Sequence, residues 1–423
     1  MEIWEMPGGN KTRSINGRTR FGLLAAFAIH KFLACLDLGT GVCALSIENK
    51  RCRKDIATTT TTMKRELPPK ILVGYTTHCS EKVAHAVRDG INVVIWSFVE
   101  MIVDSPVETD DEASPGEAKA KCISRFDVSC AKDTISRLDC EGYDDTVHLV
   151  SFGGWNGDHL PDELSAEDMY DAWKDLAGDI FHGVDWDLEG HDRLDNPTNV
   201  FSVECLENMG RFSELAKKDG YIIGMAPPQS YLDIEESRFT RNVNLTDPTR
   251  GWHDDFHYFG HNVYAYLLSK YGDSIDFVSM QFYESYSRAG LEVFHNKVAP
   301  EKYLQHYVRD LVANKEEFFF VDFDEDPSLN YASRMVHFPL SKLVFGFANG
   351  WGANDNEKVC YVDPKEIAIT YDSLTKSKIA PRGFMFWVID EEGTKDITFS
   401  KSLNEVLGIR KEKNDLSGEA KNS

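Results

Sequence analysis

From residue 70 onward, two hydrophobic patterns alternate along the chain. Short apolar runs bounded by glycine, proline and polar residues are typical of buried strands. The stretches between them repeat apolar residues every three or four positions, as in helices that cover a sheet. The predicted strands are Ile71–Tyr75, Asn92–Phe98, Val147–Gly153, Gly183–Glu189, Tyr221–Ala226, Phe277–Tyr283, Leu343–Phe347 and Gly383–Ile389.

Several of the intervening helices carry start or stop signals. Ser165, with Asp168 three residues later, is a typical opening cap. Gly220 is a typical residue just beyond a helix end, and Pro300 suits a first helical turn. Helices are therefore predicted over residues 164–180, 200–218, 263–271, 300–312 and 365–374.

Strands that alternate with helices predict a parallel sheet, and eight such units are the number that closes a (β/α)8 TIM barrel. The fold class is therefore α/β. Long loops are expected after strand two (99–146) and after strand six (285–342). An open doubly wound sheet is the alternative, but it predicts a glycine-rich phosphate loop after the first strand. Residues 74–77, Gly-Tyr-Thr-Thr, do not form one.

The chain divides into three parts by composition. Residues 1–69 combine basic residues, an interrupted apolar run over 21–36 and a threonine- and proline-containing linker. We expect a secretory signal peptide and a secreted protein, with an organellar transit peptide as the alternative. The apolar run is too short for stable membrane insertion. Residues 70–410 form the predicted barrel, and 411–423 a polar tail.

Charge and cysteine content narrow the classes of partner. A net charge of −23 argues against nucleic acid, which requires a basic surface. The nine cysteines show no C-x-x-C spacing, which argues against a zinc site. Cys122, Cys130 and Cys140 crowd one segment, which is compatible with a disulfide in a secreted protein. Buried inert thiols are the alternative.

Candidate chemistry is concentrated in the fourth predicted strand. Alternation places Asp185, Asp187 and Glu189 on one face, while Val184, Trp186 and Leu188 occupy the other. Neighbouring carboxylates repel one another and are costly to desolvate, so stability alone does not favour burying them. In a (β/α)8 barrel this face would point inward, at the strand ends where catalytic groups lie. The pattern therefore predicts a functional acid cluster.

The run from His182 to Glu189 resembles Asp-Gly-x-Asp-x-Asp-x-Glu, the signature of glycoside hydrolase family 18, the chitinase family. His182 stands where the family has the first Asp. Four other strand-end motifs of the family have similar counterparts here in the same order: Ser-Phe-Gly-Gly at 151–154, Met-Ala-Pro at 225–227, Met-Gln-Phe-Tyr at 280–283 and Phe-Trp at 386–387.

The resemblance implies retaining, substrate-assisted hydrolysis of β-1,4-linked N-acetylglucosamine polymers. Glu189 would be the general acid and base. Asp187 would orient the acetamido group of the substrate, and Asp185 would hydrogen-bond to Asp187. Tyr283 would donate its hydroxyl to the acetamido oxygen. The substrate itself supplies the nucleophile, so neither metal nor organic cofactor is implied.

The resemblance also implies a substrate-binding set. Trp387 would form an apolar floor under the reacting sugar, and Gln281 and Met225 would face the pocket. Tyr75 completes the set. For Tyr283 and Trp387, plain core packing is the alternative.

The departure at His182 has an expected consequence. His182 would support the acids as a hydrogen-bond donor, and if charged it would favour an ionised Asp185. That arrangement predicts that activity survives with a shifted pH profile.

The short segment between strands seven and eight leaves no room for an inserted domain, so the resemblance is to the shallow-groove group that includes class III chitinases. The expected partners are chitin or N-acetylglucosamine oligosaccharides, bound by a monomer. Two alternatives remain: a catalytically silent chitin-binding lectin, and an endo-β-N-acetylglucosaminidase acting on N-glycans. Glu189 is present, which favours an enzyme over the lectin.

Overall fold

The computed structural model describes residues 65–104, 119–193, 195–243, 261–284, 287–353 and 359–410. Residues 1–64 of the predicted targeting segment and linker (1–69), and the polar tail from 411, lie outside these ranges. The fold below concerns the described residues.

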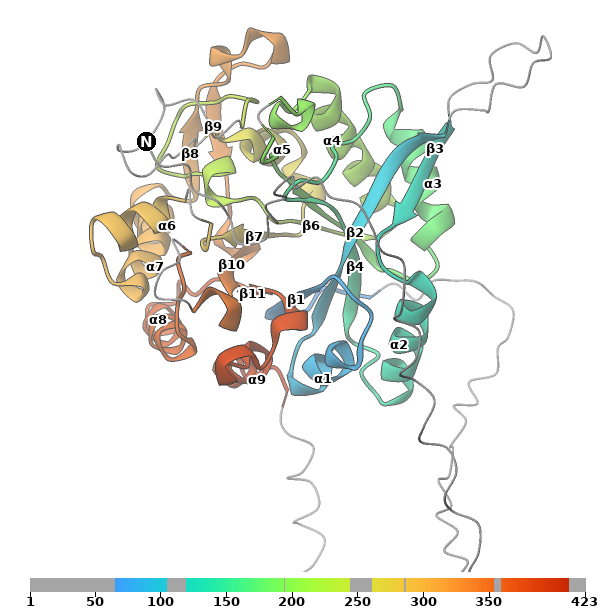
Figure 1. Cartoon of the computed structure of the whole chain (residues 1–423). Coiled ribbons are helices and arrows are strands. Elements are labelled where there is room, and N and C mark those ends of the chain that lie inside the picture. The colour runs from blue at the N-terminus through green and yellow to red at the C-terminus, as the bar shows by residue number, and fades with distance from the viewer. Residues whose placement is uncertain are drawn as a thin grey trace, which may run out of the picture. The chain divides into compact units, whose positions relative to one another are not determined.

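Eight parallel strands close into a barrel, with helices on the outside (Figure 1). Each strand pairs in parallel with the next, and β1 closes the ring by pairing with both β11 and β2. All eight predicted strands are confirmed. They are β1 (Ile71–Thr76), β2 (Val93–Asp104), β4 (Val147–Gly154), β5 (Gly183–Leu188), β6 (Ile222–Met225), β7 (Phe277–Gln281), β10 (Leu343–Ala348) and β11 (Gly383–Trp387).

The helices begin where the sequence signals them. The Ser165 hydroxyl caps α3 by accepting a hydrogen bond from the Asp168 N–H at 3.1 Å, and Pro300 occupies the first turn of α7. Gly220, just beyond α4, has a φ of 84°, which favours glycine. The helices are α1 (Glu81–Asp89), α2 (Val128–Cys140), α3 (Ala166–Ala177), α4 (Val203–Lys218), α5 (Val263–Tyr271), α6 (Arg288–Gly290), α7 (Pro300–Arg309), α8 (Pro364–Lys376) and α9 (Phe399–Leu407).

Alternate residues of each barrel strand enter two different cores. One core fills the inside of the barrel and includes Ile71, Val93, Val147 and Phe277. The other lies between the strands and the surrounding helices. Side chains alternate along each strand, so an odd or even position in the strand decides whether a side chain points inward or toward a helix.

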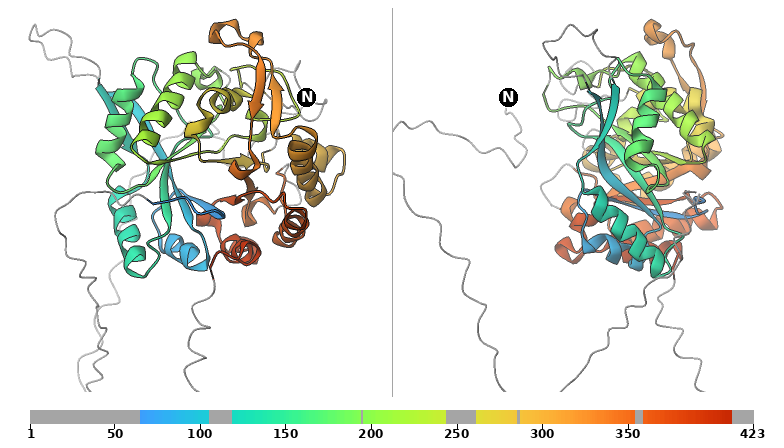
Figure 2. Two further views of the ribbon diagram at one scale, coloured as in Figure 1. Left: turned by 180° about the vertical axis from the view of Figure 1, so that it is seen from behind. Right: turned by 90° about the vertical axis from the view of Figure 1, so that its right-hand side faces the viewer.

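The two long loops contain strands that the hydrophobic pattern did not predict. β2 continues beyond the barrel and pairs with β3 (Lys119–Ser124) in an antiparallel arm. After α7, β8 (Phe318–Val321) and β9 (Arg334–His337) form a separate antiparallel hairpin. Figure 2 shows the arm and the hairpin projecting from different sides of the barrel.

A disulfide joins Cys79, which follows β1, to Cys130 in the first turn of α2. The bond confirms Cys130 as a disulfide residue, but its partner lies outside the segment that contains Cys122 and Cys140. Cys122, Cys205 and Cys360 are buried thiols. The disulfide brings partners that are 51 residues apart in sequence to a Cα–Cα distance of 6.1 Å.

Candidate active site

The acid cluster lies inside the barrel, at the carboxyl end of β5. Asp185, Asp187 and Glu189 are 0%, 3% and 5% exposed. Ser151 and Gly153 of β4 pair with Asp185 and Asp187 in the strand register. Val184, Trp186 and Leu188 enter the outer core, as the alternation predicted. The structure therefore places all three carboxyl groups together on the inward face.

Asp185 is the deepest acid and is held by hydroxyl groups. Its Oδ2 accepts hydrogen bonds from the Tyr75 hydroxyl at 2.6 Å and from the Ser151 hydroxyl at 2.9 Å. Burial raises the pKa of Asp185 to about 6, while these hydrogen bonds oppose the rise. The expected hydrogen bond to Asp187 is therefore replaced by bonds to Tyr75 and Ser151. Tyr75, expected in the substrate-binding set, is buried and supports Asp185.

The residue opposite Asp185 on β6 must be a glycine, because the Asp185 carboxyl group approaches its backbone closely. A Cβ atom on Gly224 of β6 would lie 2.6 Å from Asp185 Oδ1 and from the Phe277 ring. Such contacts are too short for any side chain, so only glycine leaves room for the carboxyl group inside the barrel.

Asp187 and Glu189 form a buried carboxyl pair that shares the side-chain amide of Gln281 as a hydrogen-bond donor. Gln281 Nε2 donates to Asp187 Oδ1 at 2.8 Å and to the Ala226 carbonyl at 2.7 Å, and it lies 3.5 Å from Glu189 Oε1. Burial raises the pKa of both acids, and the charge of each neighbouring carboxylate adds to the rise for Asp187. The pair therefore retains a proton at a higher pH than isolated carboxyl groups would.

A fourth acid, Glu284, belongs to the cluster and was missed in the sequence. It directly follows Tyr283 beyond the end of β7. Burial raises the pKa of Glu284 to about 7. The charge of Glu284 raises the pKa of Glu189 in turn, and only burial has a larger effect on Glu189. Its position at a barrel strand's carboxyl end was the available signal.

Aromatic side chains form one wall beside the acids. The partly exposed Trp387 stacks with Phe98 at a centroid distance of 5.9 Å and contacts Tyr75 at 5.5 Å. Trp351 donates its Nε1–H to the Trp387 carbonyl at 2.7 Å and meets the Tyr283 ring edge-on. Trp387 and Tyr283 were expected here, whereas Phe98 and Trp351 were not.

Tyr283 keeps its proton in this setting. Burial and the charges of Glu284, Asp187 and Glu189 all raise the pKa of its hydroxyl. The group is therefore available as a hydrogen-bond donor beside the carboxyl pair.

Met225 does not face the acids. It is fully buried in the outer core, while its neighbours Gly224 and Ala226 take the inward positions of β6. This differs from the expectation that Met225 faces the pocket. The physical reason is parity, since the strand directs Met225 toward the helices.

His182 also differs from expectation. Its Nδ1 accepts a hydrogen bond from the His148 N–H at 2.9 Å, and the two rings lie 6.0 Å apart. Burial lowers the pKa of His182 to about 3, so the ring is neutral at neutral pH. His182 stands three residues before Asp185, and the odd spacing directs it away from the acids. The expected support of the acid cluster by His182 is therefore not observed.

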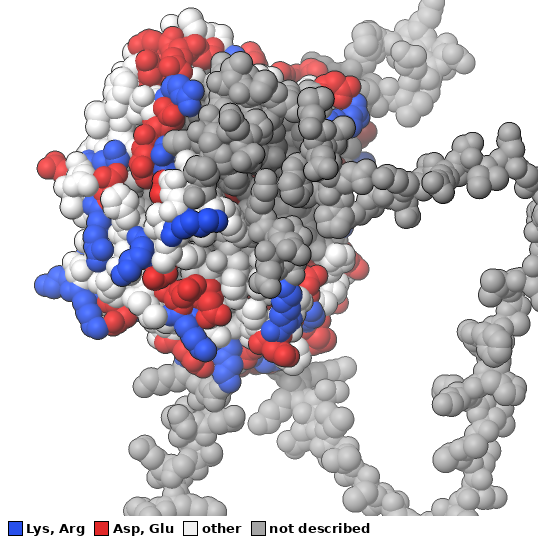
Figure 3. Space-filling model, turned by 60° about the vertical axis from the view of Figure 1, so that its left-hand side comes forward, with Lys and Arg blue, Asp and Glu red and all other residues white. Residues whose placement is uncertain are grey.

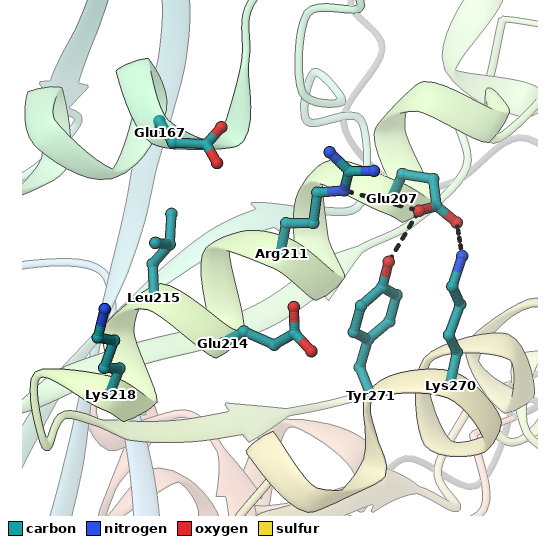
Figure 4. A pocket seen from close by; sticks show the side chains of 8 residues that line it. All are labelled: Glu167, Glu207, Arg211, Glu214, Leu215, Lys218, Lys270 and Tyr271. Carbon is teal, nitrogen blue, oxygen red and sulfur yellow. Dashed lines mark hydrogen bonds and ion pairs between the residues drawn. The ribbon is translucent and has the colours of Figure 1, made fainter.

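A separate hollow of about 600 Å³ lies outside the barrel between α3, α4 and α5 (Figure 4). Its Glu207 accepts hydrogen bonds from Lys270 and from the hydroxyl of Tyr271, and pairs with Arg211 at 3.9 Å. These charges compensate one another on the helix surface. The hollow shares no residue with the acid cluster, which remains the candidate active site.

Two further properties concern only the described residues. Within these ranges, no cluster of three or more histidine, cysteine or acidic residues has a geometry that suits a metal ion. None of the helices described is both long and apolar enough to cross a membrane. Figure 3 shows acidic and basic side chains interspersed over the part of one face that is described.

No protein-family model and no curated protein sequence matches the chain. Solved structures match its fold. A family GH18 chitinase from Chromobacterium violaceum superposes with a TM-score of 0.54 at 16% identity, over 82% of this chain and 85% of that chain. A GH18 chitinase from Pseudoalteromonas aurantia gives 0.45 at 15%, over 80% and 100%. A fungal endo-β-N-acetylglucosaminidase of glycosyl hydrolase family 18 gives 0.46 at 14%, over 81% and 99%. The Chromobacterium structure shows that the chain shares the barrel fold of this chitinase.

Proposed function

We propose that this protein is a glycoside hydrolase that cleaves β-1,4-linked N-acetylglucosamine polymers, with Glu189 as general acid and base. One observation carries the proposal: the Asp187–Glu189 pair is buried at the carboxyl end of β5 with raised pKa values, beside an aromatic wall. A general acid must hold its proton near neutral pH, and burial among carboxylates has that effect.

In the first chemical step, Glu189 donates its proton to the glycosidic oxygen. The carbonyl oxygen of the substrate's own acetamido group attacks the anomeric carbon as the bond to the leaving oxygen breaks. The result is an oxazolinium ion. Asp187, fixed by Gln281, stabilises the positive charge that develops on the acetamido nitrogen. The Tyr283 hydroxyl donates to the acetamido oxygen and orients it for attack.

In the second step, the Glu189 carboxylate removes a proton from a water molecule, which attacks the anomeric carbon and opens the oxazolinium ring. Two inversions at the same carbon give overall retention. Both steps use one residue for proton transfer, and this agrees with the position of Glu189 at the outer end of the acid series. Asp185 stays behind Asp187, held by Tyr75 and Ser151.

The aromatic wall is evidence in favour of a sugar as the substrate. Pyranose rings present C–H faces that pack on aromatic rings, and Trp387 is partly exposed next to the acids. Between β10 and β11 the described residues form short helical turns and α8, without an inserted strand. We therefore propose an open, shallow groove of the class III type.

We propose secretion as the localisation and a monomer as the working unit. The Cys79–Cys130 disulfide supports secretion, because such bonds persist in oxidising compartments. Sequencing the amino terminus of the mature protein tests this point. An organellar transit peptide predicts a different cleavage position from a secretory signal peptide.

The function is tested by assaying wild type and Glu189→Gln on chitin oligosaccharides and on a high-mannose glycopeptide. Wild-type cleavage of chitin oligosaccharides with retained anomeric configuration, lost in the variant, supports the proposal. Cleavage of the glycopeptide alone identifies an endo-β-N-acetylglucosaminidase. Binding of oligosaccharides without turnover of either substrate identifies a lectin and overturns the enzymatic proposal.

A further inference from the structure

The backbone that carries Glu189 lies beyond the last residue of β5, where side chains replace sheet pairing. β5 ends at Leu188, whose carbonyl accepts a hydrogen bond from the Tyr264 hydroxyl at 3.0 Å. The Gly190 N–H donates to the Tyr231 hydroxyl at 3.1 Å, and the His191 N–H donates to Asn199 Oδ1 at 2.7 Å. We name these side chains, together with His159 and Asn156, the β5 clasp.

The loop after β4 supplies the part of the β5 clasp nearest to the acid. His159 Nε2 lies 2.8 Å from the carbonyl oxygen of Glu189. A carbonyl oxygen only accepts, so Nε2 carries the hydrogen and donates it. The Asn156 N–H donates to the Gly190 carbonyl at 3.1 Å, and its side chain exchanges two hydrogen bonds of 2.8 Å with Asp192. The loop therefore holds the backbone at Glu189 and at the residues that directly follow it.

The His159 ring is itself fixed by packing. Its centroid lies 4.2 Å from that of Phe201, a fully buried residue. Burial lowers the pKa of His159 to about 4, although its hydrogen bond to the Glu189 carbonyl opposes this fall. The imidazole is neutral near pH 7 and holds one hydrogen, which the Glu189 carbonyl receives.

We propose that His159 is a positioning residue for Glu189. Its hydrogen bond fixes the backbone from which the Glu189 side chain projects, and so fixes the distance from that carboxyl to Asp187 and Gln281. Because a displacement of about 1 Å in a catalytic group lowers rates strongly, the effect should fall on kcat rather than on substrate binding. The inference rests on the proposed catalytic role of Glu189.

Two variants separate the hydrogen bond from the packing. His159→Phe keeps a ring against Phe201 but removes the donor, whereas His159→Gln keeps an N–H donor at a similar reach. On chitin oligosaccharides we expect His159→Phe to lower kcat about tenfold with KM within about twofold, and His159→Gln to stay within about threefold of wild type. His85→Phe, at an exposed position of α1, is the matched control. Should His159→Phe fail to fold, His159→Met serves as the non-donor variant.

A second readout does not depend on turnover. A ¹³C NMR titration of the Glu189 carboxyl group, assigned with Glu189→Gln, reports its surroundings in the free protein. We expect the midpoint of the Glu189 titration to move by about half a pH unit or more in the non-donor variant and to stay in place in His159→Gln. Equal kcat values in the donor and non-donor variants, with unmoved midpoints, would overturn the role of His159. A wild type without hydrolase activity would instead overturn the proposed function, and the titration would still decide the role of His159.

Discussion

The two ends of strand β5 bury ionisable groups of opposite kind. At the carboxyl end, Asp187 and Glu189 have raised pKa values because burial disfavours the charged carboxylate. At the amino end, His182 and His148 have lowered pKa values because burial disfavours the charged imidazolium. One physical cause, burial, thus shifts the pKa toward the uncharged form at both ends.

The difference between the ends lies in what surrounds the groups. The acids have carboxylate neighbours, the donor Gln281 and the partly exposed Trp387. The histidines face the outer core, and the positive charge of Arg65 adds to the effect of burial on His182. A strongly shifted pKa therefore does not identify a catalytic site by itself. Orientation toward the carboxyl ends of the barrel strands makes the distinction.

The largest expected effect is on catalysis and separates the two ends. Glu189→Gln should lower kcat about 10³-fold, because the amide cannot transfer the proton. His182→Gln should leave kcat within about threefold and leave the pH–rate profile in place, because His182 contacts His148 rather than the acids. Steady-state kinetics over pH 4–9 provide the measurement. A displaced profile in His182→Gln would break the distinction between the ends.

The second effect is on stability and has opposite signs at the two ends. The folded pKa of His182 is about 3 and the unfolded value is about 6.5, so the unfolded chain takes up the proton first. The contribution of neutral His182 to the free energy of unfolding is complete above pH 6.5 and declines as the pH falls toward 3. The raised pKa values of the acids act the other way, because the folded state takes up those protons first and gains stability on acidification.

Urea unfolding at pH 7 and pH 4 measures the histidine contribution. Between these values wild type should lose on the order of 3 kcal/mol more unfolding free energy than His182→Gln, from about 1.4 kcal/mol per pH unit. Only the change with pH is compared, so a constant cost of the substitution cancels. Equal pH dependence in the two proteins would show that His182 takes up its proton as readily when folded as when unfolded.

The smallest effect tests coupling within the acid cluster. Glu284 raises the pKa of Glu189 through its charge. Glu284→Gln removes that charge, so Glu189 should lose its proton at a lower pH. The basic limb of the pH–kcat profile should move down by roughly half to one unit. Glu167→Gln, at an exposed position of α3, is the control. A basic limb that stays in place would show that the charge of Glu284 does not raise the pKa of Glu189.

The barrel and its acid cluster were predictable because each depends on a local pattern. Eight apolar runs fix the strands, and alternation through Asp185, Asp187 and Glu189 fixes a shared face. The hairpin of β8 and β9 was not predicted, because Phe318 to Val321 is short and only its alternate residues are buried. Local pattern is a weak guide to such strands.

Side-chain directions and distant partners were harder to predict. Motif similarity placed Met225 in the pocket, although strand parity gives the inward position to Gly224. His182 lies in the same motif as the acids, but its odd spacing from Asp185 directs it toward His148. The partner of Cys130 lies 51 residues away in sequence and is brought close only by the tertiary fold, which no local pattern encodes.

The Cys79–Cys130 bond has a consequence for the fate of a cleaved chain. It encloses β2, β3 and everything between them, including the acid-rich segment 104–117. A protease cut anywhere within this span would leave both fragments covalently joined. The nicked protein would migrate as one band without reductant and as two bands with it, and the fragment bearing β1 would not diffuse away from the rest of the barrel.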